Sequence, residues 1–190
     1  DKVWEINVPS VETIASPQTP YGLLSNAFQK HPELFSDKKI AGVKYRVFGL
    51  GRNSKREIKY LLPTVDIQKN FSADTYKVFL PEVYGNGSLG EIPPQPILGV
   101  PYDICTQTFR QFGGFKTLEE AENFYSYIKT KFFRLMVGVL KHTHHAPAKV
   151  YSLVPMQDFS KPWTDEELYK KYNLSKDEIA FIESMIKPME

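Results

Sequence analysis

Apolar positions along the chain follow two spacings, one typical of strands and one typical of helices. Val43, Tyr45 and Val47 alternate with basic residues, and segments 76–80 and 102–109 are dense in β-branched and aromatic side chains. Alternation and this composition favour strands, so we predict a β-rich body over residues 40–113. A Gly- and Pro-rich stretch, 85–101, interrupts it. An irregular loop of that length in a compact domain is usually functional or mobile.

The region after residue 116 has helical spacing. Thr117 and Glu120 form a capping box at the start of a predicted helix over 118–140. Apolar residues recur there every three or four positions, which predicts a helix face buried in the core. A short strand is predicted over 150–154.

The last thirty residues differ in character from the rest of the chain. Thr164 with Glu167, and Ser175 with Glu178, are two further capping boxes. They predict a helical hairpin that must dock on the body, because a helix pair this short is marginal alone. We therefore predict an α+β fold: a mixed or antiparallel β-rich body with one long packed helix and a C-terminal helical hairpin. The predicted boundaries are 1–158 for the body and 159–190 for the tail.

Composition narrows the class of protein. A chain of 190 residues buries roughly 70% of its unfolded surface, and 13 Phe, 11 Tyr and 2 Trp exclude a disordered chain. No apolar run approaches the roughly 20 residues of a membrane span. One cysteine, Cys105, forms no internal disulfide, which predicts a reducing, cytoplasmic location. Asp1 follows no Met or leader, so we expect a segment from the C-terminal side of a larger protein, or else a small protein trimmed of its Met.

Charge is unevenly distributed although the net charge is only +2. Residues 38–61 carry eight basic side chains and a single acidic one, Glu57, whereas residues 158–190 carry eight acidic and five basic ones. A local basic surplus is what phosphate binding requires. A solvated hairpin is the alternative interpretation.

Three motifs suggest chemistry, and each has a plainer explanation. Residues 85–90 have the G-x-G-x-x-G spacing, but Pro93 and Pro94 exclude the helix that pyrophosphate binding needs, so a turn or recognition loop is predicted. His142, His144 and His145 lack a nearby carboxylate or Cys to complete a metal site. They predict a surface loop that could donate to phosphates or base edges.

A third motif has the composition of a metal-dependent nuclease core. Asp37, Glu57 and Lys59 supply two carboxylates for Mg²⁺ and a lysine for the attacking water. Such a triple arises by chance in most charged sequences. A Ser or Cys nucleophile has no supporting motif, so no catalytic residue is predicted.

Five segments, in order over nearly the whole chain, resemble the target recognition domain of bacterial restriction–modification adenine-specific DNA methyltransferases. They are SPQTPYGLLSNAF (16–28), YKVFLPEVYG (76–85), ICTQTF (104–109), KTKFFR (129–134) and VYSLVPMQDFSKPWTD (150–165). The first differs from the family pattern by Tyr21 in place of Phe and by one inserted residue before Phe28.

The resemblance implies a module that reads a DNA sequence. In the family, a separate N-terminal domain transfers a methyl group from S-adenosylmethionine to adenine N6, and some members add an endonuclease domain. The family's Asn-Pro-Pro-Tyr/Phe motif is missing here, since Pro93-Pro94 follow Ile92. S-adenosylmethionine, and Mg²⁺ where the parent cuts DNA, are therefore expected in the parent enzyme and not in this segment. The implied partners are double-stranded DNA and the N-terminal methyltransferase domain.

Residues that read DNA are expected where the family motifs are absent, in the basic segment, the 85–101 loop and the histidine loop. The predicted set for phosphates and major-groove base edges is Lys44, Arg46, Arg52, Asn53, Lys55, Arg56, Lys59, Asn86, Ser88, Lys141, His142 and His144. Two alternatives remain open: a metal-dependent endonuclease built on Asp37, Glu57 and Lys59, and a protein–protein interaction module that uses the helical tail.

Overall fold

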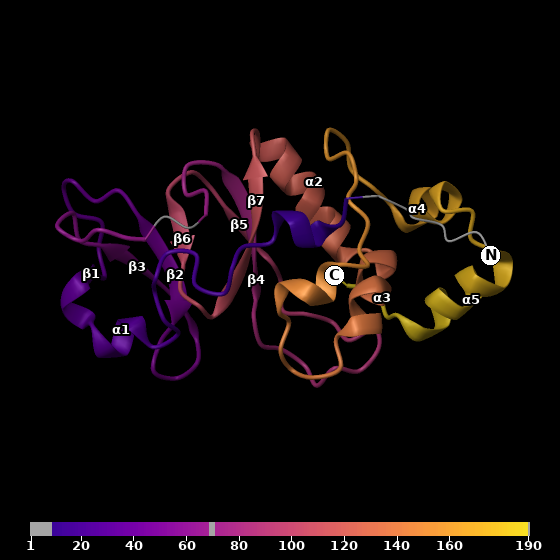
Figure 1. Ribbon diagram of the computed structural model, residues 1–190, viewed down its shortest axis with the longest axis horizontal. Helices are drawn as coiled ribbons and strands as arrows, with labels where there is room; N and C mark the ends of the chain where they lie inside the picture. Colours follow the sequence, from indigo (N-terminus) through magenta and orange to yellow (C-terminus); the bar gives the residue numbers. More distant parts are fainter. Residues whose placement is uncertain (1–8, 69–70, 190) are drawn as a thin grey trace.

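The described part of the chain contains two β-sheets. The computed structural model describes residues 9–68 and 71–189 (Figure 1), so the start of the predicted 1–158 body lies outside the described residues. One sheet has the order β1-β3-β2-β6 and is mixed, because β2 and β6 are parallel and the other pairs antiparallel. The other has the antiparallel order β5-β4-β7. The strands are β1 (Phe35–Ser36), β2 (Arg46–Leu50), β3 (Arg56–Leu61), β4 (Tyr76–Pro81), β5 (Ile97–Gly99), β6 (Asp103–Cys105) and β7 (Phe109–Phe115).

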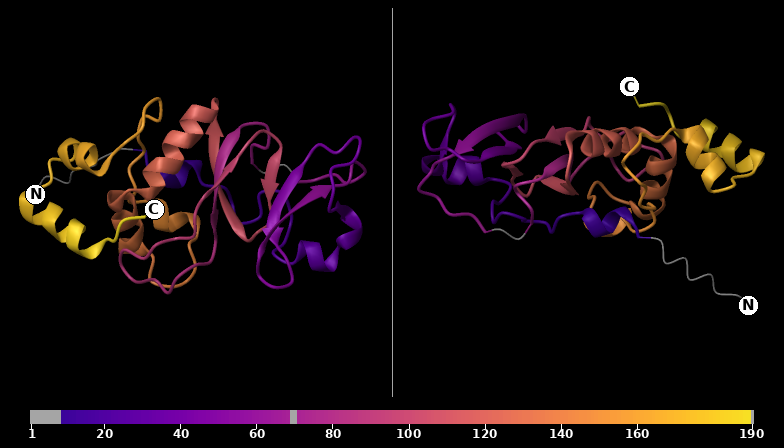
Figure 2. Two further views of the ribbon diagram at one scale, coloured as in Figure 1. Left: turned by 180° about the vertical axis from the view of Figure 1, so that it is seen from behind. Right: turned by 90° about the horizontal axis from the view of Figure 1, so that it is seen from above.

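Helices lie mostly on one side of the second sheet and at the far end from the first sheet (Figures 1 and 2). They are η1 (Val11–Ile14), α1 (Ala27–Lys30), η2 (Pro32–Leu34), α2 (Leu118–Lys129), α3 (Lys131–Leu140), η3 (Ala148–Tyr151), α4 (Asp165–Lys171) and α5 (Lys176–Met185). The predicted α+β class is confirmed. Over the described ranges, no helix is both long enough and apolar enough to span a bilayer.

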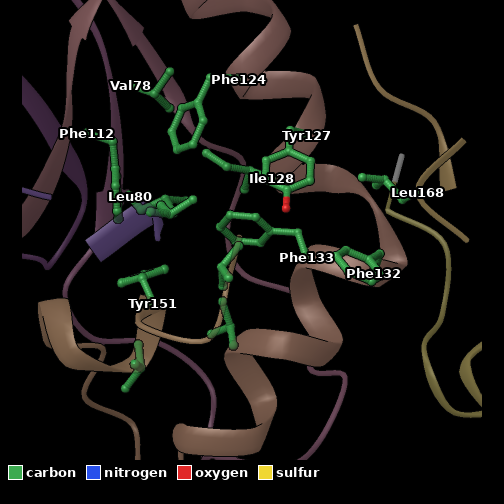
Figure 3. Packing of buried hydrophobic residues seen from close by; sticks show 14 of the residues in the cluster. Val78, Leu80, Phe112, Phe124, Tyr127, Ile128, Phe132, Phe133, Tyr151 and Leu168 are labelled. Carbon is green, nitrogen blue, oxygen red and sulfur yellow. The ribbon is translucent and has the colours of Figure 1, made fainter. Parts of the chain in front are cut away.

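Strand β4 is buried on both faces and separates two apolar clusters. Alternate side chains of a strand point to opposite faces, so Val78 and Leu80 face the cluster under α2 and α3, while Phe79 faces the cluster around the first sheet. Figure 3 shows Val78 and Leu80 among the aromatic rings of the first cluster. On the opposite face, the ring of Phe79 lies 5.3 Å from that of Phe48 on β2.

The predicted helix over 118–140 is two helices. The chain leaves helical geometry at Thr130 (φ −63°, ψ 149°), whose hydroxyl accepts a hydrogen bond from the Phe133 amide at 3.1 Å and so caps α3. Apolar spacing continues through the break because α2 and α3 line the same cluster. Periodicity therefore did not reveal the change of direction.

The predicted strand over 150–154 is also wrong. Residues 148–151 form η3, and the Val154 amide then closes a turn onto the Tyr151 carbonyl at 3.1 Å. Val150, Tyr151 and Val154 are buried, as their composition suggested, but the segment lies between Pro147 and Pro155 and pairs with no strand in the described part of the chain. Apolar runs this short do not distinguish strand from helix.

The C-terminal hairpin of α4 and α5 packs on α3, and all three predicted capping boxes are present. The carboxylate of Asp165 accepts hydrogen bonds from the amides of Lys131 (3.0 Å) and Phe132 (2.9 Å), so the tail caps the helix on which it packs. The ring of Phe132 stacks on Tyr172 with 5.0 Å between centroids.

We expect Asp165→Ala to destabilise the protein by about 1–2 kcal/mol, because it removes a charged acceptor from two helix N-terminal amides. Asp177→Ala is the matched control, since Asp177 is an exposed aspartate in the first turn of α5. Chemical denaturation measures both variants. If the two variants lose equal amounts of unfolding free energy, the carboxylate of Asp165 contributes no more than its interaction with the dipole of α4.

Lys77 is a buried cation in β4 that connects the two sheets. Its ammonium donates to the carbonyls of Ala73 (2.7 Å) and Asp103 (3.0 Å), and the side chain has no exposed surface. Burial lowers the pKa of Lys77 from 10.5 to about 8. The folded state therefore releases this proton at lower pH than the unfolded state does.

The unfolding free energy of the wild type is consequently expected to rise between pH 8 and pH 10 relative to that of Lys77→Met, by an amount on the order of 1–2 kcal/mol. In this window the unfolded chain holds more protons at residue 77 than the folded chain, so increasing pH favours folding. Below pH 8 both states are protonated and the difference levels off. Urea titrations at four pH values test the slope; parallel curves for the two proteins would contradict it.

Candidate nucleic-acid interface

The β2–β3 hairpin carries an exposed basic turn. The Gly51 amide bonds to the Lys55 carbonyl (2.9 Å) and the Ser54 amide to the Gly51 carbonyl (3.1 Å), which closes the turn between paired residues Leu50 and Arg56. Arg52, Asn53 and Lys55 are exposed, and their side chains have no hydrogen-bond or ionic partner in the described parts of the chain. The turn thus presents two uncompensated cations to solvent.

A groove of about 540 Å³ lies beside this turn. In Figure 1 the turn and the loop that follows β4 both reach the lower edge of the molecule. Groups from six segments line the groove: Gln18 and Ser25, Ser54 and Arg56, Glu82 and Val83, Pro94, Gln107 and Thr108, and His145. The basic segment, the 85–101 loop and the histidine loop each reach the groove, through Arg56, Pro94 and His145, and of the predicted DNA-binding residues Arg56 alone is among those that line it.

A buried ion pair stabilises the floor of the groove. Arg110 binds Glu82 through two hydrogen bonds of 2.9 and 2.7 Å, and its third nitrogen bonds to the Ser16 carbonyl. Burial raises the pKa of Glu82, which the Arg110 guanidinium partly offsets. The charges of Arg110 and Glu82 cancel each other. The positive charge at the groove that remains uncompensated therefore comes from Arg56 and from the exposed cations of the turn.

Arg56 lies between the turn and the 85–101 loop. Its guanidinium donates to the Gln95 carbonyl at 2.8 Å and lies 5.8 Å from the centre of the Phe109 ring. Burial lowers the pKa of Arg56. The contact fixes the side chain at the groove wall.

Four of the predicted DNA-binding residues serve the fold or lie elsewhere. Lys141 is buried and donates to the carbonyls of Tyr84 (2.9 Å) and Thr143 (2.8 Å) and to Glu91. Lys141 has almost no exposed surface through which it could contact a phosphate, so the prediction that it binds DNA is wrong. A lysine at the end of an amphipathic helix had suggested an exposed side chain. Arg46 makes a bidentate pair with Asp103, at 2.7 and 2.6 Å, and Lys59 pairs with Asp37.

Lys44, the fourth, lies over aromatic rings at the other end of β2 from the turn. Its ammonium is 4.7 Å from the centre of the Tyr102 ring and 5.4 Å from that of Tyr45. The structure does not bring it to the groove.

The 85–101 loop, which was expected to be functional or mobile, is anchored by contacts of Glu91. Glu91 accepts hydrogen bonds from the amides of Asn86 (2.9 Å) and Gly87 (3.1 Å) and pairs with Lys141, and the loop's end forms β5. Asn86 accepts from the Ser88 amide (3.0 Å) and hydroxyl (2.6 Å). Both side chains are exposed but hydrogen-bonded to each other.

The histidine loop packs beside the 85–101 loop. Gly87 lies against the backbone of His142 and Thr143, where a Cβ would clash. His142 and His144 are exposed, and the rings of His144 and His145 are 4.3 Å apart. His145 reaches the groove wall.

The structure also describes residues of the two alternative interpretations, the endonuclease and the interaction module. Lys59 pairs with Asp37, and residues 9–68 and 71–189 contain no group of three or more His, Cys, Asp or Glu side chains placed to hold a metal ion. In the tail, the ring of Tyr172 stacks on Phe132, while Phe181 is 50% and Met185 46% exposed.

The residues that sequence reasoning missed are Gln18, Ser25, Gln107 and Thr108. They lie inside the segments that resemble the family signature, 16–28 and 104–109, which were expected to be structural. Their sequence neighbours are themselves largely polar, as in Thr106-Gln107-Thr108 and Ser25-Asn26, so no local pattern distinguishes them.

Glu82→Ala is expected to destabilise the protein by about 3–5 kcal/mol, because it leaves the Arg110 guanidinium buried without its counter-ion. Replacing the pair together, with Glu82→Leu and Arg110→Met, is expected to recover more than half of that loss. Glu57→Ala, which removes an exposed carboxylate, is the control. A double variant as unstable as Glu82→Ala would contradict this account.

Comparison with known proteins adds no relative to this description. No family model, no curated protein and no solved structure matches the chain. The candidate site therefore depends on its own geometry and on the resemblance carried by its sequence segments.

Proposed function

We propose that this chain binds double-stranded DNA and reads its sequence as the target recognition module of a restriction–modification adenine methyltransferase. The observation that carries the proposal is the juxtaposition at the groove: an unpaired basic turn lies beside a groove whose apolar lining is interspersed with the neutral polar side chains of Gln18, Ser25, Gln107 and Thr108. Cations position a protein on phosphates, and neutral polar groups discriminate base edges.

The tip of the β2–β3 hairpin extends beyond its neighbouring strands. β6 pairs with β2 only over residues 46–48 and β1 pairs with β3 only over residues 60–61, so residues 49–50 and 56–57 form a short two-stranded ribbon with the turn at its end, and the major groove of B-DNA admits such a ribbon. Arg52 and Lys55 extend from its tip and are free to contact phosphates. Arg56, fixed against Gln95, lies where the ribbon meets the groove.

The methyltransferase context is supported by the five segments that resemble the family. In this arrangement, methyl transfer from S-adenosylmethionine to adenine N6 belongs to a separate N-terminal domain. The present chain selects the DNA sequence at which that transfer takes place.

The test is fluorescence anisotropy of the chain with a labelled random-sequence duplex over a salt series. The logarithm of the association constant should fall linearly with the logarithm of salt concentration. Arg52→Ala with Lys55→Ala should weaken binding on the order of 10-fold at low salt and reduce the slope by about two, about one for each lost phosphate contact.

The matched control removes two exposed tail lysines, with Lys170→Ala and Lys176→Ala. It changes net charge equally but should leave most of the affinity. Wild-type chain that does not bind duplex at low salt, or equal losses in the two double variants, would contradict the proposal.

A further inference from the structure

We propose that Gln107 is a base-reading residue that selects adenine at one position of the DNA target; this inference rests on the proposed function. Gln107 lies in the turn between β6 and β7 and lines the groove.

The turn that carries Gln107 is held on both sides by backbone hydrogen bonds. The Thr106 amide donates to the Phe48 carbonyl (2.9 Å), the Gln107 amide to the Leu23 carbonyl (2.8 Å) and the Glu82 amide to the Thr108 carbonyl (2.9 Å). The hydroxyls of Thr106 and Thr108 lie 2.6 Å apart beneath it. Three separate parts of the chain thus fix this backbone, and a fixed backbone is what discriminating readout requires.

The side chain on this rigid support has no partner of its own. No hydrogen bond joins the Gln107 carboxamide to any residue within 9–68 or 71–189. Two other partly or fully buried glutamines show the contrast. Gln111 accepts from the Tyr21 hydroxyl (2.7 Å) and donates to the Ser72 carbonyl (2.9 Å), and Gln157 accepts from Lys171 (2.6 Å).

An unused donor and acceptor on one planar group match one base edge in particular. A glutamine carboxamide forms a bidentate pair with the N6 amino group and N7 of adenine in the major groove. It carries no charge, so it contributes to base choice without acting as a phosphate anchor. Arg52 and Lys55 on the neighbouring turn supply that second function.

The experiment is selection of bound duplexes from a randomised pool, followed by sequencing, with the wild-type chain and variants. Gln107→Glu should change the preference at a single position from A·T to C·G, because a carboxylate accepts a hydrogen bond from cytosine N4. Gln107→Ala should equalise the bases at that position, with a loss of discrimination of about 5- to 150-fold. The salt dependence of binding should be unchanged by Gln107→Ala. Gln68→Glu adds the same charge at an exposed glutamine that does not line the groove, and it should leave every position as in the wild type.

The outcomes separate this inference from the proposed function. If the wild-type chain selects a sequence and both Gln107 variants select the same one, Gln107 is not a reading residue and the module stands. If the wild-type chain binds DNA but selects no sequence, the inference fails while DNA binding holds. If the wild-type chain does not bind duplex at all, both fail.

Discussion

The burial of both faces of β4 is the constraint on which the rest of the structure depends. Val78 and Leu80 face one apolar cluster and Phe79 faces the other, so a single strand holds the two halves together. The strand ends at Pro81, and the next residue, Glu82, pairs with Arg110 of the adjacent strand. The groove is located where this shared strand stops, since Pro81, Glu82 and Val83 are among the residues that line it.

The sequence was sufficient for the class of fold and for the helices that begin at capping boxes. Capping boxes at Thr117, Thr164 and Ser175 identified helix starts because their geometry is local. The break at Thr130 was missed because two helices that line one cluster keep a continuous apolar stripe. The pairing of β2 with β6 was also beyond reach, since a parallel partner 57 residues away leaves no local signal.

The candidate site was predicted in part. The basic turn was identified by counting charges along the sequence, and such a count does not distinguish free cations such as Arg52 and Lys55 from paired ones. For that reason the same count included Arg46 and Lys59, which pair with Asp103 and Asp37, and a charged helix end suggested Lys141, which is buried. The neutral groove residues were missed because the sequence does not show whether a neutral polar side chain already has a hydrogen-bond partner within the protein.

The contact between Asp165 and α3 also has a consequence for how the chain acquires its structure during synthesis. The amides at the start of α3 obtain their acceptor from a residue more than thirty positions later, and the cluster is covered by Ile182 and Ile186. A ribosome that has released residues 9–160 has therefore produced both sheets but an uncovered hydrophobic face. Until residue 186 emerges, the part of that face that Ile186 covers stays exposed to solvent.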